Sequence, residues 1–222
     1  MARLKFQLDL VTRSTQRPVT IEVNRVVCAG YTGRNTRAVM EHVHELEKIG
    51  VAAPKRIPTS YIVPPELLTS ENHVRVNGLR TSGEVEYVIF LDQEWYVTIG
   101  SDHTDRQVET QDIQKSKEMC PKIVAREAWQ YEEIKNHWDQ LMIRSTVTER
   151  GQTALYQEGT TATILSPDNL RERLQLKPGD ALFSGTVPLK TREPRYGEKY
   201  TIEIEDPVMA RKITHEYSVA MN

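Results

Sequence analysis

Residues 82–103, SGEVEYVIFLDQEWYVTIGSDH, guide how the whole chain is read. Apolar and β-branched residues stand on both sides of a short polar turn, which is the pattern of a β-hairpin. Side chains two residues apart in a strand point to the same face, so Glu84 and Glu86 share a face with Val88 and Phe90. Buried carboxylates repel each other and lose hydration unless they are protonated, exposed or bound to a cation. The hairpin therefore raises a question of chemistry as well as of fold.

The position of a third carboxylate depends on the length of the turn. A three-residue turn centred on Gln93 places Asp102 opposite Glu84 and Gly100 opposite Glu86, so that the three carboxylates converge. A two-residue turn shifts Asp102 by one position, and its side chain then faces away. Three converging carboxylates suit a hard divalent cation such as Mg²⁺, Mn²⁺ or Ca²⁺. An exposed sheet face that carries charges is the alternative, and the sequence leaves both open.

The rest of the chain is also rich in strand patterns, with a few helices. We expect a strand pair within residues 4–23, and a helix at about 35–49 where apolar residues recur every three to four positions. A second helix is expected over 105–119, and a short one follows Ser166, a typical N-cap. The proline-rich stretch 51–70 is the best candidate for a linker, although TSYIV within it could pair into a sheet. Strands and helices do not alternate regularly, which argues against a doubly wound sheet or a TIM barrel.

Composition narrows the class of protein. The chain has 222 residues and a net charge of −2, from 29 basic and 31 acidic residues, so no nucleic-acid partner is expected. There is no long apolar run and the N-terminus lacks the pattern of a signal peptide. We therefore expect a cytoplasmic protein with no membrane partner. Cys28 and Cys120 form no CxxC pair and are expected to be reduced thiols.

Five segments, in the same order along the chain, resemble the fumarylacetoacetate hydrolase family in its C-terminal catalytic domain. They are CAGYTGRN, GEVEYVIF, GSDHTDRQVE, KSKEMCP and LKPGDALFSGT. The resemblance implies an α+β, β-rich fold: a mixed β-sandwich roll of the fumarylacetoacetase catalytic-domain type with a few peripheral helices. Residues 66–222 would form the metal-binding core. Residues 1–65 would supply N-terminal strands and a helix, as part of the same unit or as a small appendage.

The resemblance also implies roles for individual residues. Glu84, Glu86 and Asp102 correspond to the family's metal ligands, with Mg²⁺ as the default ion and Mn²⁺ or Ca²⁺ as alternatives. Lys115 corresponds to a lysine that stabilises developing negative charge beside the metal.

The acid/base pair of the family has the pattern H-x-x-E. His42 and Glu45 match it when about three residues are inserted, and their i, i+3 spacing on a helix lets them touch. Glu45 would then orient His42 to activate a water molecule. His44 is a rival for this role, and a solvated helix face is the structural alternative.

Three further residues are implied to contact substrate. Thr186 corresponds to a threonine of the substrate loop, and Glu109 stands where relatives often have glutamine. Arg106 is a candidate for binding a substrate carboxylate, with pairing to a neighbouring acidic residue as the alternative. The lysine motif and the loop after Thr186 depart from the family pattern, so the substrate is expected to differ from those of the best-known members.

The activity implied is divalent-metal-dependent hydrolysis of a C–C bond in a small 2-oxo or 1,3-dioxo carboxylic acid. The same metal and base would serve an oxo-acid decarboxylase, an isomerase or a hydratase, and the sequence does not separate these reactions. A non-catalytic protein that keeps the fold and binds a metal or ligand is the alternative from another class. Because relatives commonly form homodimers, a homodimer is expected here.

Overall fold

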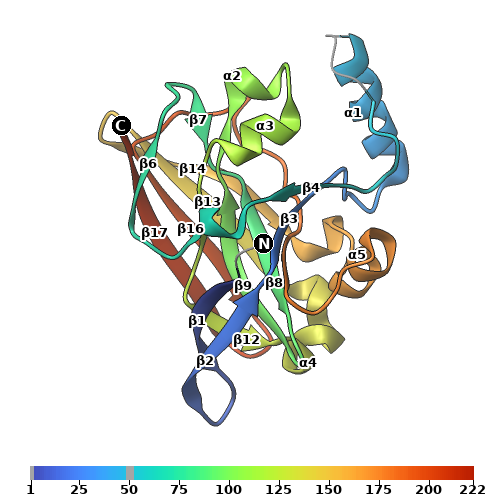
Figure 1. The fold of residues 1–222 in the computed structure, drawn as a ribbon, viewed down its shortest axis with the longest axis vertical. Coiled ribbons are helices and arrows are strands. Elements are labelled where there is room, and N and C mark those ends of the chain that lie inside the picture. The colour runs from blue at the N-terminus through green and yellow to red at the C-terminus, as the bar shows by residue number, and fades with distance from the viewer. Residues whose placement is uncertain (1–2, 49–52) are drawn as a thin grey trace.

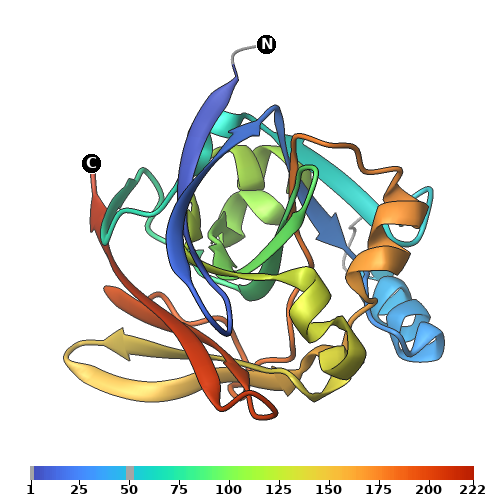
Figure 2. The same ribbon diagram turned by 90° about the horizontal axis from the view of Figure 1, so that it is seen from below.

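The computed structural model describes residues 3–48 and 53–222, without the side chains of His42 and Leu46. Within these residues, ten strands form a mixed sheet, and Figures 1 and 2 show that the sheet is strongly curled. In order of pairing it consists of β2 (Gln16–Val23), β1 (Leu4–Val11), β12 (Glu127–Gln130), β9 (Trp95–Asp102), β8 (Val85–Leu91), β15 (Asp180–Phe183), β3 (Arg25–Gly30) and β4 (Thr59–Val63), while β11 (Lys122–Val124) pairs with β9 and β5 (Leu68–Thr69) pairs with β11.

A second sheet lies along one side of this curl (Figure 2). Its strands, in order of pairing, are β14 (Gln152–Thr160), β13 (Met142–Glu149), β16 (Lys199–Asp206), β17 (Arg211–Met221) and β6 (His73–Val76). A short separate pair is formed by β7 (Thr81–Ser82) and β10 (Thr104–Asp105). Most strand pairs in these sheets are antiparallel. The ten-stranded sheet also contains parallel pairs such as β1–β12 and β3–β15, so it is mixed, as expected.

The helices are short and lie at the periphery. They are α1 (Thr36–Lys48), α2 (Arg106–Glu109), α3 (Ile113–Glu118), α4 (Tyr131–Ile134) and α5 (Pro167–Leu174), with 3₁₀ turns η1 (Pro65–Leu67), η2 (Lys135–Gln140) and η3 (Thr161–Thr163). In Figure 1, α2 and α3 cover one end of the curl, and in Figure 2 they lie within its outline. No helix within residues 3–48 and 53–222 is long and apolar enough to span a membrane.

Strand β8 has a different apolar core on each face. Val85, Tyr87 and Ile89 belong to the cluster that joins the curl to the second sheet. Val88 and Phe90 belong to a second cluster, which fills the inside of the curl. Burying a large apolar side chain in either cluster contributes about 1.5–3 kcal/mol. The alternation predicted for the hairpin is confirmed, and Glu84 and Glu86 lie on the side that faces into the curl.

Several elements agree with the sequence patterns. Ser166 accepts a hydrogen bond from the backbone of Asn169 and so caps α5, as predicted. The strands β16 and β17 form a C-terminal hairpin, as the strand patterns of residues 199–221 indicate. The stretch proposed as a linker contains β4, which pairs with β3, so the N-terminal strands share one sheet with β8 and β15.

The single helix predicted over 105–119 is wrong, because two short helices occur there. Asp105 caps α2 by accepting hydrogen bonds from the backbone of Gln107 and Val108. Asp112 then caps α3 by accepting one from the backbone of Lys115. An aspartate at an N-cap adopts an extended backbone, which is incompatible with the middle of a helix, so Asp112 starts a new helix.

Candidate metal centre

The β8–β9 hairpin has the three-residue turn on which the sequence argument depends. Glu86 lies opposite Gly100, and the paired register leaves three residues centred on Gln93 between the strands. At the far end, the backbone N–H of Asp102 donates to the carbonyl of Glu84 at 3.0 Å. The register that was left open is thereby decided, and Asp102 stands across from Glu84.

The three carboxylates converge inside the curl. One oxygen from each of Glu84, Glu86 and Asp102 lies within 4.8 Å of the others. Glu86 and Asp102 are buried, whereas the Glu84 side chain keeps 23% of its surface exposed. We call these three residues the carboxylate cluster. Glu84 is the one partly exposed member of this cluster, so a ligand would enter from its side.

Two lysines neutralise Asp102. Lys117, from α3, forms a charged hydrogen bond with one carboxylate oxygen, and Lys122, from β11, lies 3.0 Å from the other. Burial alone would raise the pKa of Asp102, but the two lysines hold it below its usual value. Lys122 also donates to the carbonyl of His103 at 2.7 Å, so its place is fixed by the backbone as well.

Glu84 has a cationic partner of its own. Arg106 lies 3.2 Å from Glu84 and 2.9 Å from Glu109, and its Nε donates to the Ser82 hydroxyl at 2.7 Å. Burial would lower the pKa of Arg106, but the two glutamates raise it above its usual value.

Glu86 is different, since it forms no ion pair with the residues that the structure describes. Its Oε2 accepts a hydrogen bond from the backbone of Gly185 at 2.9 Å. Burial and the nearby Asp102 raise the pKa of Glu86 well above its usual value. A bound cation would relieve both penalties. The all-oxygen donor set and this uncompensated carboxylate fit a hard divalent ion.

The lysine beside the cluster is Lys117 rather than the predicted Lys115. Both are on α3, but Lys115 is exposed and its backbone takes part in the capping of the helix by Asp112. Lys117 is buried, and its ammonium also lies 5.9 Å from the ring centre of Tyr61. Residues two apart on a helix point in different directions, so only one of the two lysines can face the cluster.

The role of His42 as the catalytic base remains a prediction. His42 falls within α1, but its side chain is outside the described part of the structure. His44 and Glu45 are exposed. Figures 1 and 2 show α1 at the outer edge of the molecule, on the side opposite β17.

The predicted substrate contacts are engaged with other side chains. Arg106 and Glu109 pair with each other, which is the alternative named for the arginine. The Thr186 hydroxyl donates to the carbonyl of Val85 at 2.7 Å. It also accepts a hydrogen bond from Gln157 at 2.7 Å. Thr186 is thus next to the cluster through β8, and a direct contact with substrate remains a prediction.

Sequence reasoning missed residues whose neighbours come from distant parts of the chain. They are Lys117, Lys122, Tyr61 and Gln157. Tyr61, on β4, has its pKa raised to about 12, chiefly by burial. Gln157 precedes Glu158 and a glycine, which is typical of a polar turn, but it is fully buried in β14. The spacing KSK contains a signal for Lys117, whereas nothing local identifies the others.

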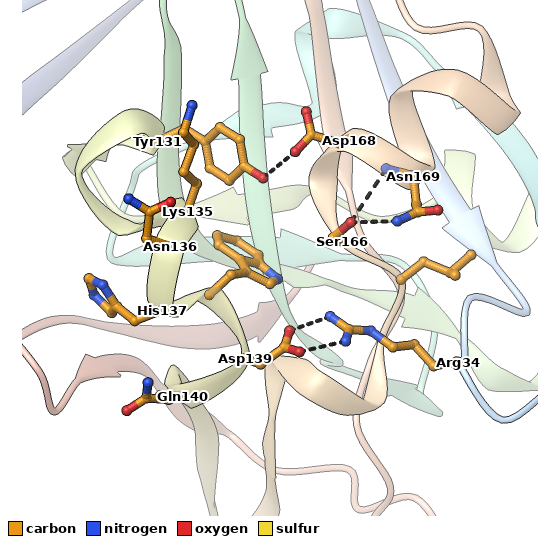
Figure 3. A pocket seen from close by; sticks show the side chains of 12 residues that line it. Arg34, Tyr131, Lys135, Asn136, His137, Asp139, Gln140, Ser166, Asp168 and Asn169 are labelled. Atoms are coloured by element: carbon orange, nitrogen blue, oxygen red, sulfur yellow. Dashed lines mark hydrogen bonds and ion pairs between the residues drawn. The ribbon is translucent and has the colours of Figure 1, made fainter.

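A pocket of about 600 Å³ lies apart from the cluster, between α4, η2 and the start of α5 (Figure 3). The guanidinium of Arg34 pairs with both oxygens of Asp139 at 2.5 and 2.8 Å. The Tyr131 hydroxyl donates to Asp168 at 2.6 Å. None of the three clustered carboxylates lines this pocket. Arg34 and Asp139 are thus paired with each other, and the candidate metal centre is a separate place in the molecule.

A curled mixed sheet, packed against a second sheet and carrying carboxylates inside, defines the class of fumarylacetoacetate hydrolase-like folds, and solved structures confirm the assignment. A candidate fumarylpyruvate hydrolase from Burkholderia cenocepacia matches with a TM-score of 0.63 at 16% identity, over 100% of this chain and 94% of that one. The chain itself belongs to the family described as protein of unknown function DUF2848, whose model matches residues 29–217.

Two further structures share the fold. A 2-keto-3-deoxy-D-arabinonate dehydratase complexed with magnesium and 2,5-dioxopentanoate matches with a TM-score of 0.58 at 18% identity, over 92% of this chain and 76% of that one. A 4-oxalocrotonate decarboxylase from Pseudomonas putida G7, complexed with calcium and acetate, matches with a TM-score of 0.59 at 12% identity, over 89% and 79%. No curated protein matches the sequence. At these identities the likeness establishes the fold, which is the fold that the sequence motifs predicted.

Proposed function

We propose that the protein is a divalent-metal-dependent enzyme that acts on a small 2-oxo or 1,3-dioxo carboxylic acid, with hydrolysis of a C–C bond as the favoured reaction. The observation that carries this proposal is the convergence of Glu84, Glu86 and Asp102, in which Glu86 forms no ion pair with the described residues. The hydrolase, dehydratase and decarboxylase that share the fold are named for oxo-acid substrates, and two of their structures contain magnesium or calcium.

The carboxylate cluster would hold Mg²⁺, or Mn²⁺ or Ca²⁺ in its place. When bound, such an ion polarises an oxo group as a Lewis acid, which favours bond cleavage next to it. The partly exposed Glu84 leaves the open side on which an oxo-acid would meet the site.

The chain's own residues would handle charge and protons. The ammonium of Lys117 is held beside Asp102 and would stabilise negative charge that develops on the substrate. Arg106 would bind a substrate carboxylate in place of its present partner Glu109. His42, oriented by Glu45, is proposed as the base, with His44 as its rival. Deprotonating water gives a hydrolase, and deprotonating the substrate gives a decarboxylase or isomerase.

The experiment combines a panel of acylpyruvates and other 2-oxo acids with metal removal. We expect turnover that is lost on treatment with EDTA and restored by Mg²⁺ or Mn²⁺. Glu86→Gln should abolish it. Glu94→Gln is the matched control, because Glu94 is exposed at the far end of the same hairpin. Turnover that survives in Glu86→Gln would contradict the site.

One observation favours a non-catalytic binding protein as the second candidate. Asp102 is paired with Lys117 and Lys122, and Glu84 is paired with Arg106. Two of the three carboxylates of the cluster therefore have cationic partners without a metal, as expected for a fold that has lost the chemistry. Mn²⁺ binding that depends on Glu86, without turnover of any oxo-acid in the panel, would support this candidate.

A further inference from the structure

We infer that Gln157 is a positioning residue of the carboxylate cluster: it fixes the start of β8 and the loop at 184–187, so that Glu84 and Glu86 face one point. The inference deepens the proposed function and rests on it for the identity of the ligand. Gln157 comes from the second sheet and is remote from the hairpin in sequence. It touches none of the three carboxylates and would act through the backbone that carries them.

The amide of Gln157 closes a ring of hydrogen bonds with two other residues. Its Oε1 accepts from the backbone N–H of Val85 at 2.9 Å, and its Nε2 donates to the Thr186 hydroxyl at 2.7 Å. The same hydroxyl donates to the carbonyl of Val85 at 2.7 Å. A further hydrogen bond joins Nε2 to the carbonyl of Val187 at 2.9 Å. Both backbone groups of Val85 are therefore held by this ring.

Val85 is the first residue of β8 and lies between Glu84 and Glu86, and its backbone needs these partners. The neighbouring strand β15 pairs with β8 only at Val88, Ile89 and Phe90. Beyond Val88 the ladder with β15 ends, and Ser184 adds a backbone hydrogen bond to the carbonyl of Tyr87 at 3.3 Å. At Val85, buried backbone groups left without partners would cost about 1–3 kcal/mol each. Gln157 and Thr186 take the place of the missing strand. They thereby fix the position of the backbone from which the side chains of Glu84 and Glu86 project.

The same ring places the donor to Glu86. Gly185 donates its N–H to Glu86 at 2.9 Å, and its neighbour Thr186 is anchored by Gln157. Gly185 has a φ of +83°, and a Cβ there would lie 2.3 Å from the Thr32 hydroxyl oxygen, so this position of the loop needs a glycine. Losing Gln157 would loosen the loop and β8 together.

A β-bulge turns Gln157 inward. The register between β13 and β14 shifts where Ser145 pairs with Gln157 and Thr146 pairs with Leu155, which leaves Tyr156 as the extra residue. As a result Tyr156 and Gln157 are consecutive and both buried, although strand neighbours normally face opposite sides. Bulges commonly re-aim side chains next to active sites. The β-bulge and the hydrogen-bonded ring therefore both support one arrangement, in which the Gln157 side chain is directed toward the start of β8.

The test compares Mn²⁺ affinity between variants of the full chain. Gln157→Met keeps the volume but removes the amide, and we expect its Mn²⁺ dissociation constant to rise about 10-fold or more, as for residues that orient metal ligands. Thr186 is the half-buried member of the ring. Thr186→Val removes its hydroxyl, which breaks the ring, and should raise the Mn²⁺ dissociation constant by a similar factor. Because both variants break one ring, the double variant should lose little more than the worse single variant.

Thr161→Val is the matched control. Thr161 is fully buried, and its hydroxyl donates to the carbonyl of Trp138, away from the cluster. This variant should lower the melting temperature without changing Mn²⁺ affinity. Wild-type Mn²⁺ affinity in folded Gln157→Met, or in folded Thr186→Val if the first variant does not fold, overturns the inference.

A readout without metal separates this inference from the proposed function. If wild-type protein binds no Mn²⁺, the proposed function fails, whereas amide hydrogen exchange still tests the ring. We expect the amides of Val85 and Gly185 to lose at least about 10-fold protection in Gln157→Met, beyond the general loss seen in Thr161→Val. Unchanged protection at Val85 overturns the inference.

Discussion

Lys117 and Lys115 lie two positions apart on α3 but have different surroundings. Lys117 is buried and paired with Asp102, while Lys115 is exposed. Breaking a buried ion pair typically lowers the free energy of unfolding by about 3 kcal/mol. We expect that loss for Lys117→Met in urea unfolding of the metal-free protein. Lys115→Met should change it by less than about 0.5 kcal/mol, and equal losses in the two variants would contradict the assignment.

His103 gives the metal-free protein a dependence on pH. Its Nδ1 lies 3.1 Å from the Tyr217 hydroxyl, and its Nε2 lies 3.0 Å from the Thr81 hydroxyl. Burial, with Lys122 and Arg106, lowers the pKa of His103 to about 3. The unfolded chain has a histidine pKa of about 6.5, so between these values it binds more protons than the folded chain. The free energy of unfolding therefore falls as the pH falls, by up to about 1.4 kcal/mol per pH unit.

The measurement is urea unfolding in EDTA between about pH 5 and pH 7. His103→Gln keeps a donor and an acceptor but does not titrate, so its free energy of unfolding should depend less steeply on pH than that of the wild type. His73→Gln, at an exposed position, should keep the wild-type slope. The same slope in His103→Gln and wild type would show that His103 is not the titrating group.

At the residue scale, the sequence predicts those features of the site that follow from the local spacing of residues along a strand. Glu84 and Glu86 follow from the two-residue period of a strand, and Asp102 follows once the turn length is known. The partners of these carboxylates do not follow. Lys117 was passed over for Lys115 because a motif match does not say which face of a short helix is buried. Gln157 reads as a turn residue because its partners are far away in sequence.

At the scale of elements, Gly100 lets three strands pack closely beside the cluster. A Cβ at this position would lie 2.6 Å from Val88 Cγ2 and 2.7 Å from the carbonyl oxygen of Ile123. That oxygen belongs to β11, which pairs with β9, so it cannot move without disturbing the sheet. Overpacking of this kind typically costs about 1–3 kcal/mol. We expect Gly100→Ala to lower the free energy of unfolding by that amount and to weaken Mn²⁺ binding.

The control for Gly100 is Gly151, in the turn between β13 and β14. Gly151 has a φ of +77°, and nothing lies within 4 Å of a Cβ built there. Asparagine tolerates this conformation, so Gly151→Asn should change the free energy of unfolding by about 0.5 kcal/mol or less. Urea unfolding and Mn²⁺ titration of Gly100→Ala and Gly151→Asn compare the two variants in stability and in Mn²⁺ affinity. A harmless Gly100→Ala would mean that the strands are spaced more widely than described.

The elements themselves are predicted best where caps and turns are local. Ser166 marks the start of α5, and the C-terminal hairpin is readable from its strands. The stretch 105–119 was misread because a helical pattern hides an interruption. Asp112 looks like an ordinary polar helix residue, yet its side chain competes for a backbone N–H and starts a second helix. That competition places Lys117 at the cluster.

At the scale of the whole molecule, sequence predicts the class of fold but not its pairing. The strand-rich pattern without regular alternation excludes parallel α/β architectures, and the ordered motifs indicate the roll. The pairing of β1 with β12 and of β3 with β15 joins residues more than a hundred positions apart. Such contacts depend on the complementarity of whole faces, which no local pattern records.

Metal binding should be visible in the stability of the whole molecule. An ion that binds only the folded chain adds about 2.7 kcal/mol at 100 times its dissociation constant. For a chain of 222 residues this raises the melting temperature by about 5–10 °C. We expect that rise for the wild type with Mn²⁺, measured by thermal unfolding followed by circular dichroism.

Glu86→Gln should reverse the order of stability between the two conditions. Glu86 is a buried carboxylate that forms no ion pair with the described residues, so a neutral amide there removes a destabilising charge, and its carbonyl can still accept from Gly185. In EDTA the variant should therefore melt at or above the wild-type temperature. With Mn²⁺ it should melt below the wild type, because it has lost a ligand, while exposed Glu94→Gln should follow the wild type in both conditions. An equal rise with Mn²⁺ in Glu86→Gln would place the metal elsewhere in the molecule.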